Sequence, residues 1–284
     1  YMPGKQFGQD VPGDTRYRKL KVQFKEQNEN ESWVWMPPYP YSPYEDITFE
    51  GNKPYEPPSK IHWLGTDNTG RDVFARLCYA FNISISFALL LTIINYIIGV
   101  LIGGTMGYYG GKFDLFFQRL IEIWSSLPML FVIIILSSIL KPSFLLLISI
   151  YTLVNWISMT YLMRAEFYRE KAKAYVAAAL SMGQSEFKVM FKHILPNILR
   201  PVLVIATIGL SQAIITESTL SFLGVGFPPT NPSLGTLIRL GNDFLFSGEW
   251  WITFFPAIFL VILAFSINLL GDWMRDTLNP RLKK

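Results

Sequence analysis

The sequence is poor in charge, cysteine and histidine. Of its 284 residues, 16% are charged and 51% hydrophobic, with one cysteine and two histidines. An ordinary soluble domain carries about 25% charged residues. The single cysteine excludes an internal disulfide scaffold, and a net charge of +4 without a dense basic run does not indicate nucleic-acid binding. The composition therefore indicates a protein whose surface is largely covered by lipid.

The charges that are present are distributed unevenly. Residues 1–76 contain ten of the 25 Lys and Arg residues, eleven of the 21 acidic residues and nine of the 18 prolines. This region has no helical or strand periodicity, so we expect an extended surface segment. It is either a solvated loop or a region that binds a partner, because its composition fits both. We interpret the remainder, 77–284, as a transmembrane domain.

Five long apolar runs follow. Four of them, 77–111, 123–140, 142–163 and 250–271, contain no charged residue, and 201–222 contains only Glu217. A helix needs about 20 apolar residues to cross about 30 Å of hydrocarbon. The sequence therefore predicts an all-α, polytopic transmembrane helical bundle. Its five spans are expected near 84–108, 122–140, 143–163, 199–222 and 251–271.

The cations predict the orientation of these spans. Seven Lys and Arg residues lie in 164–200 and four lie in 275–284, and such residues accumulate on the cytoplasmic side. The C-terminus and the 109–121 connection are then cytoplasmic, and residues 1–76 are external. Because an external N-terminal segment must be exported, we expect a further span before residue 1. Removal of a leader is the alternative.

Glycine recurs every four residues at the end of the first predicted span, at Gly99, Gly103, Gly107 and Gly111. Residues four apart share one helix face, and glycine allows two backbones to approach closely. The ribbon predicts close helix packing, within the chain rather than at a subunit interface.

The cytoplasmic stretch 172–196 has the pattern of a docking element. A small-residue helix is expected to turn at Gly183, which adopts positive φ without strain. A second helix, 186–193, would be capped by Ser185 and ended by Leu195-Pro196. A plain amphipathic loop is the alternative. The residues assigned to docking are Tyr175, Ala177, Ala178, Ala179, Gly183, Ser185, Leu195 and Pro196.

Individual polar residues add four expectations. Glu217 is the one carboxylate in the interior of a predicted span, since Glu122 lies at the first residue of its span, so Glu217 is either a substrate or partner contact or a hydrated structural group at the outer pore mouth. Asp67, Arg71 and Asp72 are expected to pair and cap a short helix, 71–79. His62 is expected at the surface, and Cys78 is expected to be buried.

Enzyme chemistry is not indicated. Gly110-Gly111-Lys112 lacks the spacing of a phosphate loop and is followed by Phe113 instead of Ser or Thr. The predicted spans contain no His, and Glu217 is the one acidic residue in their interiors, so no catalytic residue, metal site or bound cofactor is predicted. An ion-coupled secondary transporter would be expected to show internal repeats and several buried ionisable groups, and neither is found.

Several motifs resemble those of one family. Residues 175–183 with Leu195-Pro196 resemble the E-A-A-x3-G and I-x-L-P pattern of binding-protein-dependent ABC importer permeases, with Ala177 and His193 as departures. Further segments resemble C-type permeases of dipeptide and oligopeptide importers, most of all the YejE subgroup. These segments are 35–38, 64–67, 70–73, 107–111, 117–125, 221–224 and 271–276.

The resemblance implies a MetI-like permease fold with six spans and a coupling helix at 172–196. It implies a peptide or peptide-like antibiotic as cargo and half of a translocation pore in a bacterial inner membrane. The implied partners are a second, B-type permease subunit, two ATPase subunits or one fused ATPase that bind ATP and Mg²⁺, and an external peptide-binding protein. A non-peptide cargo such as nickel or an opine-like solute is the alternative.

Overall fold

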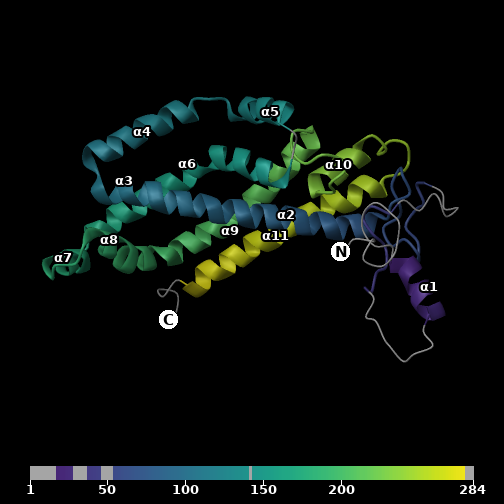
Figure 1. Cartoon of the computed structure of the whole chain (residues 1–284), viewed down its shortest axis with the longest axis horizontal. Coiled ribbons are helices and arrows are strands. Elements are labelled where there is room, and N and C mark those ends of the chain that lie inside the picture. The colour runs from purple at the N-terminus through teal and green to yellow at the C-terminus, as the bar shows by residue number, and fades with distance from the viewer. Residues whose placement is uncertain (1–16, 28–36, 46–53, 141–142, 279–284) are drawn as a thin grey trace. The chain divides into compact units, whose positions relative to one another are not determined.

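The computed structural model describes residues 17–27, 37–45, 54–140 and 143–278 (Figure 1). Within these residues the chain is helical, and its one β-bridge joins Thr66 and Asp72. The helices are α1 (Tyr17–Gln27), α2 (Val73–Ile98), α3 (Gly104–Tyr109), α4 (Gly111–Ser125), α5 (Met129–Ile139), α6 (Phe144–Lys171), α7 (Ala174–Ser181), α8 (Glu186–Lys188), α9 (Leu195–Leu223), α10 (Leu234–Asn242) and α11 (Trp251–Leu278).

Four helices of the described chain are long and apolar enough to cross a membrane. They are Val73–Tyr109, Phe144–Lys171, Val202–Leu223 and Trp251–Thr277. The all-α polytopic prediction is therefore confirmed. The first of these helices contains a π-helical segment, η3 (Gly99–Gly103), and begins well before residue 84. The short helix expected at 71–79 is thus the beginning of a long one.

The expected span at 122–140 differs from the prediction. It is divided between α4 and α5, which are bent by 72° at the break between them. Pro128 precedes α5 in an extended conformation, with ψ 91°, and proline disfavours a continuing helix. The connection expected at 109–121 is mostly helix α4, whose Asp114 binds Arg164 of α6 through two contacts of 2.6 Å.

The chain forms two units. The first contains 1–84, 221–224 and 228–260, and the second contains 85–220, 225–227 and 261–284. In the second unit, the glycine ribbon packs on α6, as predicted. A Cβ at Gly99, Gly103 or Gly107 would collide with Met159, Thr160 or Arg164, respectively. Glycine is therefore required there by space, which is the reason for close packing inside the chain.

The ribbon ends before Gly111, contrary to the expectation that all four glycines pack alike. Gly111 has φ 56°, and a Cβ there would meet no described atom within 4 Å. It follows Gly110, with φ 65°, so these two glycines serve the turn between α3 and α4. Gly104, which the sequence analysis missed, has the packing role instead, because a Cβ there would lie 3.0 Å from Phe167.

In the first unit, the beginning of α2 is held by buried polar contacts. Asp67 accepts hydrogen bonds from the backbone N–H groups of Thr69 and Arg71, both at 2.9 Å, and pairs with the guanidinium groups of Arg71 and Arg76. Asp72 caps the helix through the N–H of Ala75 at 2.8 Å. The expected capping cluster is therefore confirmed.

Burial alone would raise the pKa of the Asp67 carboxyl. The positive charges of Arg76 and Arg71 outweigh that effect and hold the pKa below its ordinary value. The carboxylate is thus ionised and paired at neutral pH.

Three expectations for the first unit are wrong. His62 is 1% exposed instead of lying at the surface, because its Nδ1 lies 2.8 Å from Asp72 Oδ2. The same oxygen accepts a 2.6 Å hydrogen bond from Tyr39. Cys78 is exposed instead of buried. The N-terminal region is also not wholly extended, since α1 is helical and its Arg18 pairs with Glu45 at 3.0 Å.

Candidate coupling site

The stretch between α6 and α9 folds back on the second unit as two short helical pieces. Figure 1 shows α7 and α8 at the end where α6 leaves and α9 returns. One face of this hairpin is buried in a hydrophobic cluster, through Val176 and Ala179 of α7 and Met190 beyond α8. They pack with Tyr108 and Phe167, which come from α3 and α6. The hairpin is therefore anchored as a packed element rather than as a free loop.

Gly183 makes the turn between the two pieces. Its φ is 78°, and its N–H donates to the carbonyl of Leu180 at 2.9 Å. The next N–H, from Gln184, reaches back to Ala179 at 3.2 Å. The predicted positive φ is confirmed. A Cβ at Gly183 would meet no described atom within 4 Å, so backbone conformation and not space requires glycine there.

The second piece differs from its prediction at both ends. Ser185 occupies the N-cap position, but among the described contacts its side chain makes no capping hydrogen bond. Leu195-Pro196 does not end the helix. Instead, a π-helical segment, η4 (Val189–Ile194), leads directly into α9. Proline lacks an N–H and crowds the carbonyl four residues earlier, and the wider π-helical turn accommodates both effects.

The hairpin also exposes a surface. Ala177 and Ala178 are exposed, whereas Ala179 is 3% exposed and belongs to the core. Of these three alanines, therefore, only Ala177 and Ala178 contribute to the exposed surface. Beside it, Met182 and Phe187 are 72% and 70% exposed. Exposed apolar side chains outside the candidate membrane spans are a feature of interaction surfaces.

A buried carboxylate supports the base of the hairpin. Glu170, 4% exposed, accepts hydrogen bonds from Tyr175 Oη at 2.9 Å and Lys173 Nζ at 2.5 Å. Burial raises the pKa of the Tyr175 phenol and the neighbouring Glu170 raises it further, although Asn197 lowers it. Sequence reasoning found Tyr175 but missed Glu170, because the two residues lie on different helices, α6 and α7, and no helical spacing links them.

The other candidate residues belong to α9. Leu195 packs against the hydrophobic cluster, and Pro196 is exposed. Glu217 is in α9, 1% exposed, with Ser218 Oγ 3.5 Å from its carboxylate. Its role in transport stays a prediction. Within the described ranges, no group of three or more His, Cys, Asp or Glu residues is arranged to hold a metal ion.

Together, the apolar helices define a multi-pass α-helical membrane protein, and the anchored hairpin connects two of them. The family described as "Binding-protein-dependent transport system inner membrane component" matches residues 99–284. The chain belongs to this family. It is a multi-pass inner membrane protein of a family that transports solutes.

Similarity to individual permease proteins supports this assignment. The chain is 41% identical to the inner membrane ABC transporter permease protein YejE of Escherichia coli (strain K12), over 90% of this chain and 74% of that protein. It is 42% identical to the peptidoglycan transport system permease protein YejE of Agrobacterium fabrum, over 78% and 58%. It is 37% identical to the dipeptide transport system permease protein DppC of Bacillus subtilis, over 80% and 71%.

A solved structure confirms the fold. It is described as inward-facing conformations of the MetNI methionine ABC transporter, and its similar chain has a TM-score of 0.51 and 17% identity. The similarity covers 71% of this chain and 97% of that chain. At this identity the likeness concerns the fold alone, and it agrees with the predicted MetI-like bundle.

Proposed function

We propose that this chain is a permease subunit of an ATP-driven peptide importer. The observation that carries the proposal is its 41% identity to a YejE permease over 90% of the chain, together with relatives named for peptidoglycan and dipeptide transport. Such cargoes share amide bonds. No relative among these three is named for nickel or an opine, so the peptide cargo is the better supported one.

The chain does not hydrolyse ATP in this proposal. ATP and Mg²⁺ bind to two ATPase subunits, or one fused ATPase, which dock on the hairpin 172–196. The support is the exposed surface of Ala177, Ala178, Met182 and Phe187 on an element anchored in the core. A packed hairpin moves as a rigid body, so closure of the ATPases would be transmitted to α6 and α9.

A second, B-type permease subunit would complete the pore, and an external binding protein would deliver the peptide. The seven cations in 164–200 support a cytoplasmic hairpin. The N-terminal segment is then external and the C-terminus cytoplasmic. Labelling of single cysteines at Ser185 and Trp63 with an impermeant maleimide, in a Cys78→Ala background, tests this orientation.

Reconstitution tests the function. The full chain is assembled in lipid vesicles with its companion permease, ATPases and binding protein. We expect uptake of a short labelled peptide that requires ATP and is accompanied by peptide-stimulated ATP hydrolysis. Transport by this chain alone, driven by an ion gradient, would contradict the proposal and favour a secondary transporter.

A further inference from the structure

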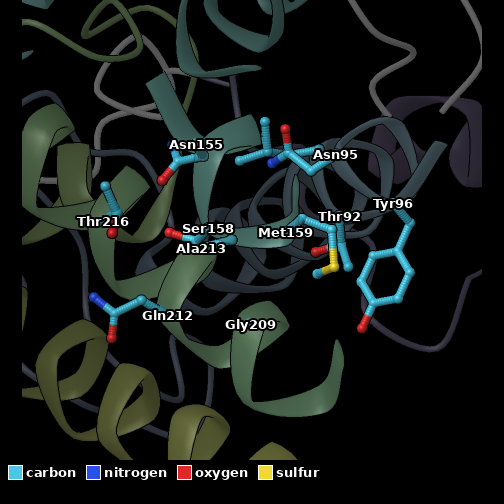
Figure 2. A pocket seen from close by; sticks show the side chains of 11 residues that line it. Thr92, Asn95, Tyr96, Asn155, Ser158, Met159, Gly209, Gln212, Ala213 and Thr216 are labelled. Carbon is cyan, nitrogen blue, oxygen red and sulfur yellow. The ribbon is translucent and has the colours of Figure 1, made fainter. Parts of the chain in front are cut away.

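The second unit contains a pocket between three apolar helices that carries several polar side chains. The pocket has a volume of about 170 Å³ and is lined by α2, α6 and α9 (Figure 2). Most of its surface is apolar, through residues such as Leu91, Met159 and Ala213, its polar groups are amides and hydroxyls, and none of its lining residues is charged. The polar residues that carry the argument are Thr92, Asn95, Asn155, Ser158, Gln212 and Thr216.

These residues repeat at helical spacing, so each helix turns one polar stripe toward the pocket. Figure 2 shows Asn155, Ser158, Gln212 and Thr216 at one side of the view and Thr92 and Asn95 at the other. The pocket lies near the middle of the three candidate spans Val73–Tyr109, Phe144–Lys171 and Val202–Leu223. Polar groups are costly at that depth and mark functional positions.

The pocket is not explained by helix packing. Asn95 is 8% exposed, and its Oδ1 is buried with no hydrogen-bond partner among the described residues. Asn155 Nδ2 donates at 3.0 Å to Tyr151 of its own helix, which leaves Oδ1 available. A buried amide oxygen without a donor is unfavourable. In this pocket, the buried Asn95 oxygen and the exposed Asn155 oxygen can therefore accept hydrogen bonds from a ligand.

We infer that this pocket binds the backbone amide groups of the transported peptide. Uncharged amides and hydroxyls both donate and accept, so they match a peptide N–H and C=O without selecting a side chain or a charged terminus. A cavity of about 150 Å³ holds a molecule the size of benzene, so this pocket accommodates one or two peptide units and not a whole peptide. The inference rests on the proposed function and names the part of the cargo that this site recognises.

Cysteine protection tests the inference in the assembled complex. A Cβ at Gly209, which lines the pocket, would meet no described atom within 4 Å, so Gly209→Cys fits. Thr219→Cys is the matched control on the same helix, because the Thr219 hydroxyl bonds only Ile215 of α9 and is outside the pocket. Both variants are made in a Cys78→Ala background. The probes are trialanine and trialanine N-methylated at both amides, each at a concentration that saturates the binding protein.

We expect trialanine to slow alkylation at position 209 by about 10-fold and the N-methylated peptide to slow it by about 2-fold at most, since each lost hydrogen bond weakens binding by roughly 2- to 10-fold. Position 219 should be unaffected. Equal protection by both peptides, protection at neither position, or equal protection at 209 and 219 would overturn the inference.

A transport measurement separates this inference from the proposed function. For Asn155→Leu and Gln212→Leu, the uptake ratio of trialanine to its N-methylated form should fall by about 2- to 10-fold relative to the parent complex. The contribution of the binding protein cancels in this ratio. An unchanged ratio with intact ATP-driven uptake would refute peptide binding by the pocket but not the proposed transport function. Protection at position 209 without ATP-driven uptake would refute the transport function but not peptide binding by the pocket.

Discussion

Two buried polar sites, one in each unit, differ in how their side-chain oxygens are paired. At the beginning of α2, Asp67 and Asp72 are both 1% exposed, and their carboxylates accept hydrogen bonds from backbone N–H groups and side chains. In the pocket of the second unit, Asn95 is almost as buried, but its side-chain oxygen has no partner among the described residues. The first arrangement contributes stability. In the second, the Asn95 side-chain oxygen can still accept a hydrogen bond from a ligand.

The difference gives a criterion for separating structural from functional polar residues in this chain. A charged group that is buried and paired is expected to affect folding when it is altered. A neutral group that is buried and unpaired is expected to affect function instead, because its removal relieves an unfavourable burial. Asp67→Ala and Asn95→Leu test this criterion directly, whereas Gly103→Ala and Gly183→Val test packing space and turn geometry.

Asp67→Ala is expected to be the most damaging. It leaves the Arg76 guanidinium, which is 3% exposed, buried without its carboxylate, and breaking such a pair costs about 3–5 kcal/mol. The free energy of unfolding of the purified complex, or the yield of folded complex, measures the effect. Arg119→Ala is the control, since the Arg119–Glu122 pair is exposed and contributes about 0–1 kcal/mol.

The pH dependence of the same site has a defined sign. Because the folded-state pKa of Asp67 is depressed, its stabilisation is present above the unfolded pKa of about 3.9 and is lost as pH falls through the folded value. The parent complex should therefore keep this contribution from pH 7 to pH 5. Equal stability of Asp67→Ala and the parent at pH 7 would contradict the structural role of the cluster.

Gly103→Ala comes next, as a test of space. Its Cβ would collide with the backbone carbonyl oxygen of Thr160, and overpacking costs about 1–3 kcal/mol. Gly209→Ala offers a matched control, because its Cβ meets no described atom within 4 Å and alanine favours a helix by about 1 kcal/mol over glycine. The melting temperature should fall for the first and hold or rise for the second. The reverse order would refute the packing assignment.

Gly183→Val tests backbone conformation at the hairpin. Positive φ costs an L-residue about 1–2 kcal/mol, and a β-branched residue more. We expect the complex to assemble but to hydrolyse ATP with less peptide uptake per ATP. Gly183→Asn should retain coupling, because asparagine tolerates this conformation. Full coupling in Gly183→Val would mean that the turn geometry is not needed.

The sequence predicted those features that depend on local pattern. Charge-free runs predicted the apolar helices, and a four-residue glycine period predicted the packing of Gly99, Gly103 and Gly107 on α6. The presence of glycine at position 183 predicted a turn with positive φ, which the structure has. Each of these predictions depends on residues that lie close together in the sequence.

Features that depend on tertiary contacts were missed. His62 is buried where it contacts the Asp72 carboxylate, and no local sequence pattern predicts that contact. A π-helical segment lets the helix continue through Pro196, contrary to the usual effect of proline. The pocket was detectable in part, because Asn155 and Ser158, three residues apart, form a polar stripe on an uncharged span. Only the fold shows that the polar stripes of α2, α6 and α9 face the same pocket.

Asn95→Leu is expected to have the smallest effect on stability and decides the comparison most directly. Leucine has a similar shape and removes the unpaired oxygen, so the free energy of unfolding should stay constant or rise by about 1 kcal/mol. Peptide uptake should fall while assembly and basal ATP hydrolysis are retained. The melting temperature and uptake of the same preparation are measured together. A destabilised protein with unchanged specific uptake would place Asn95 with Asp67, among residues that hold the fold together.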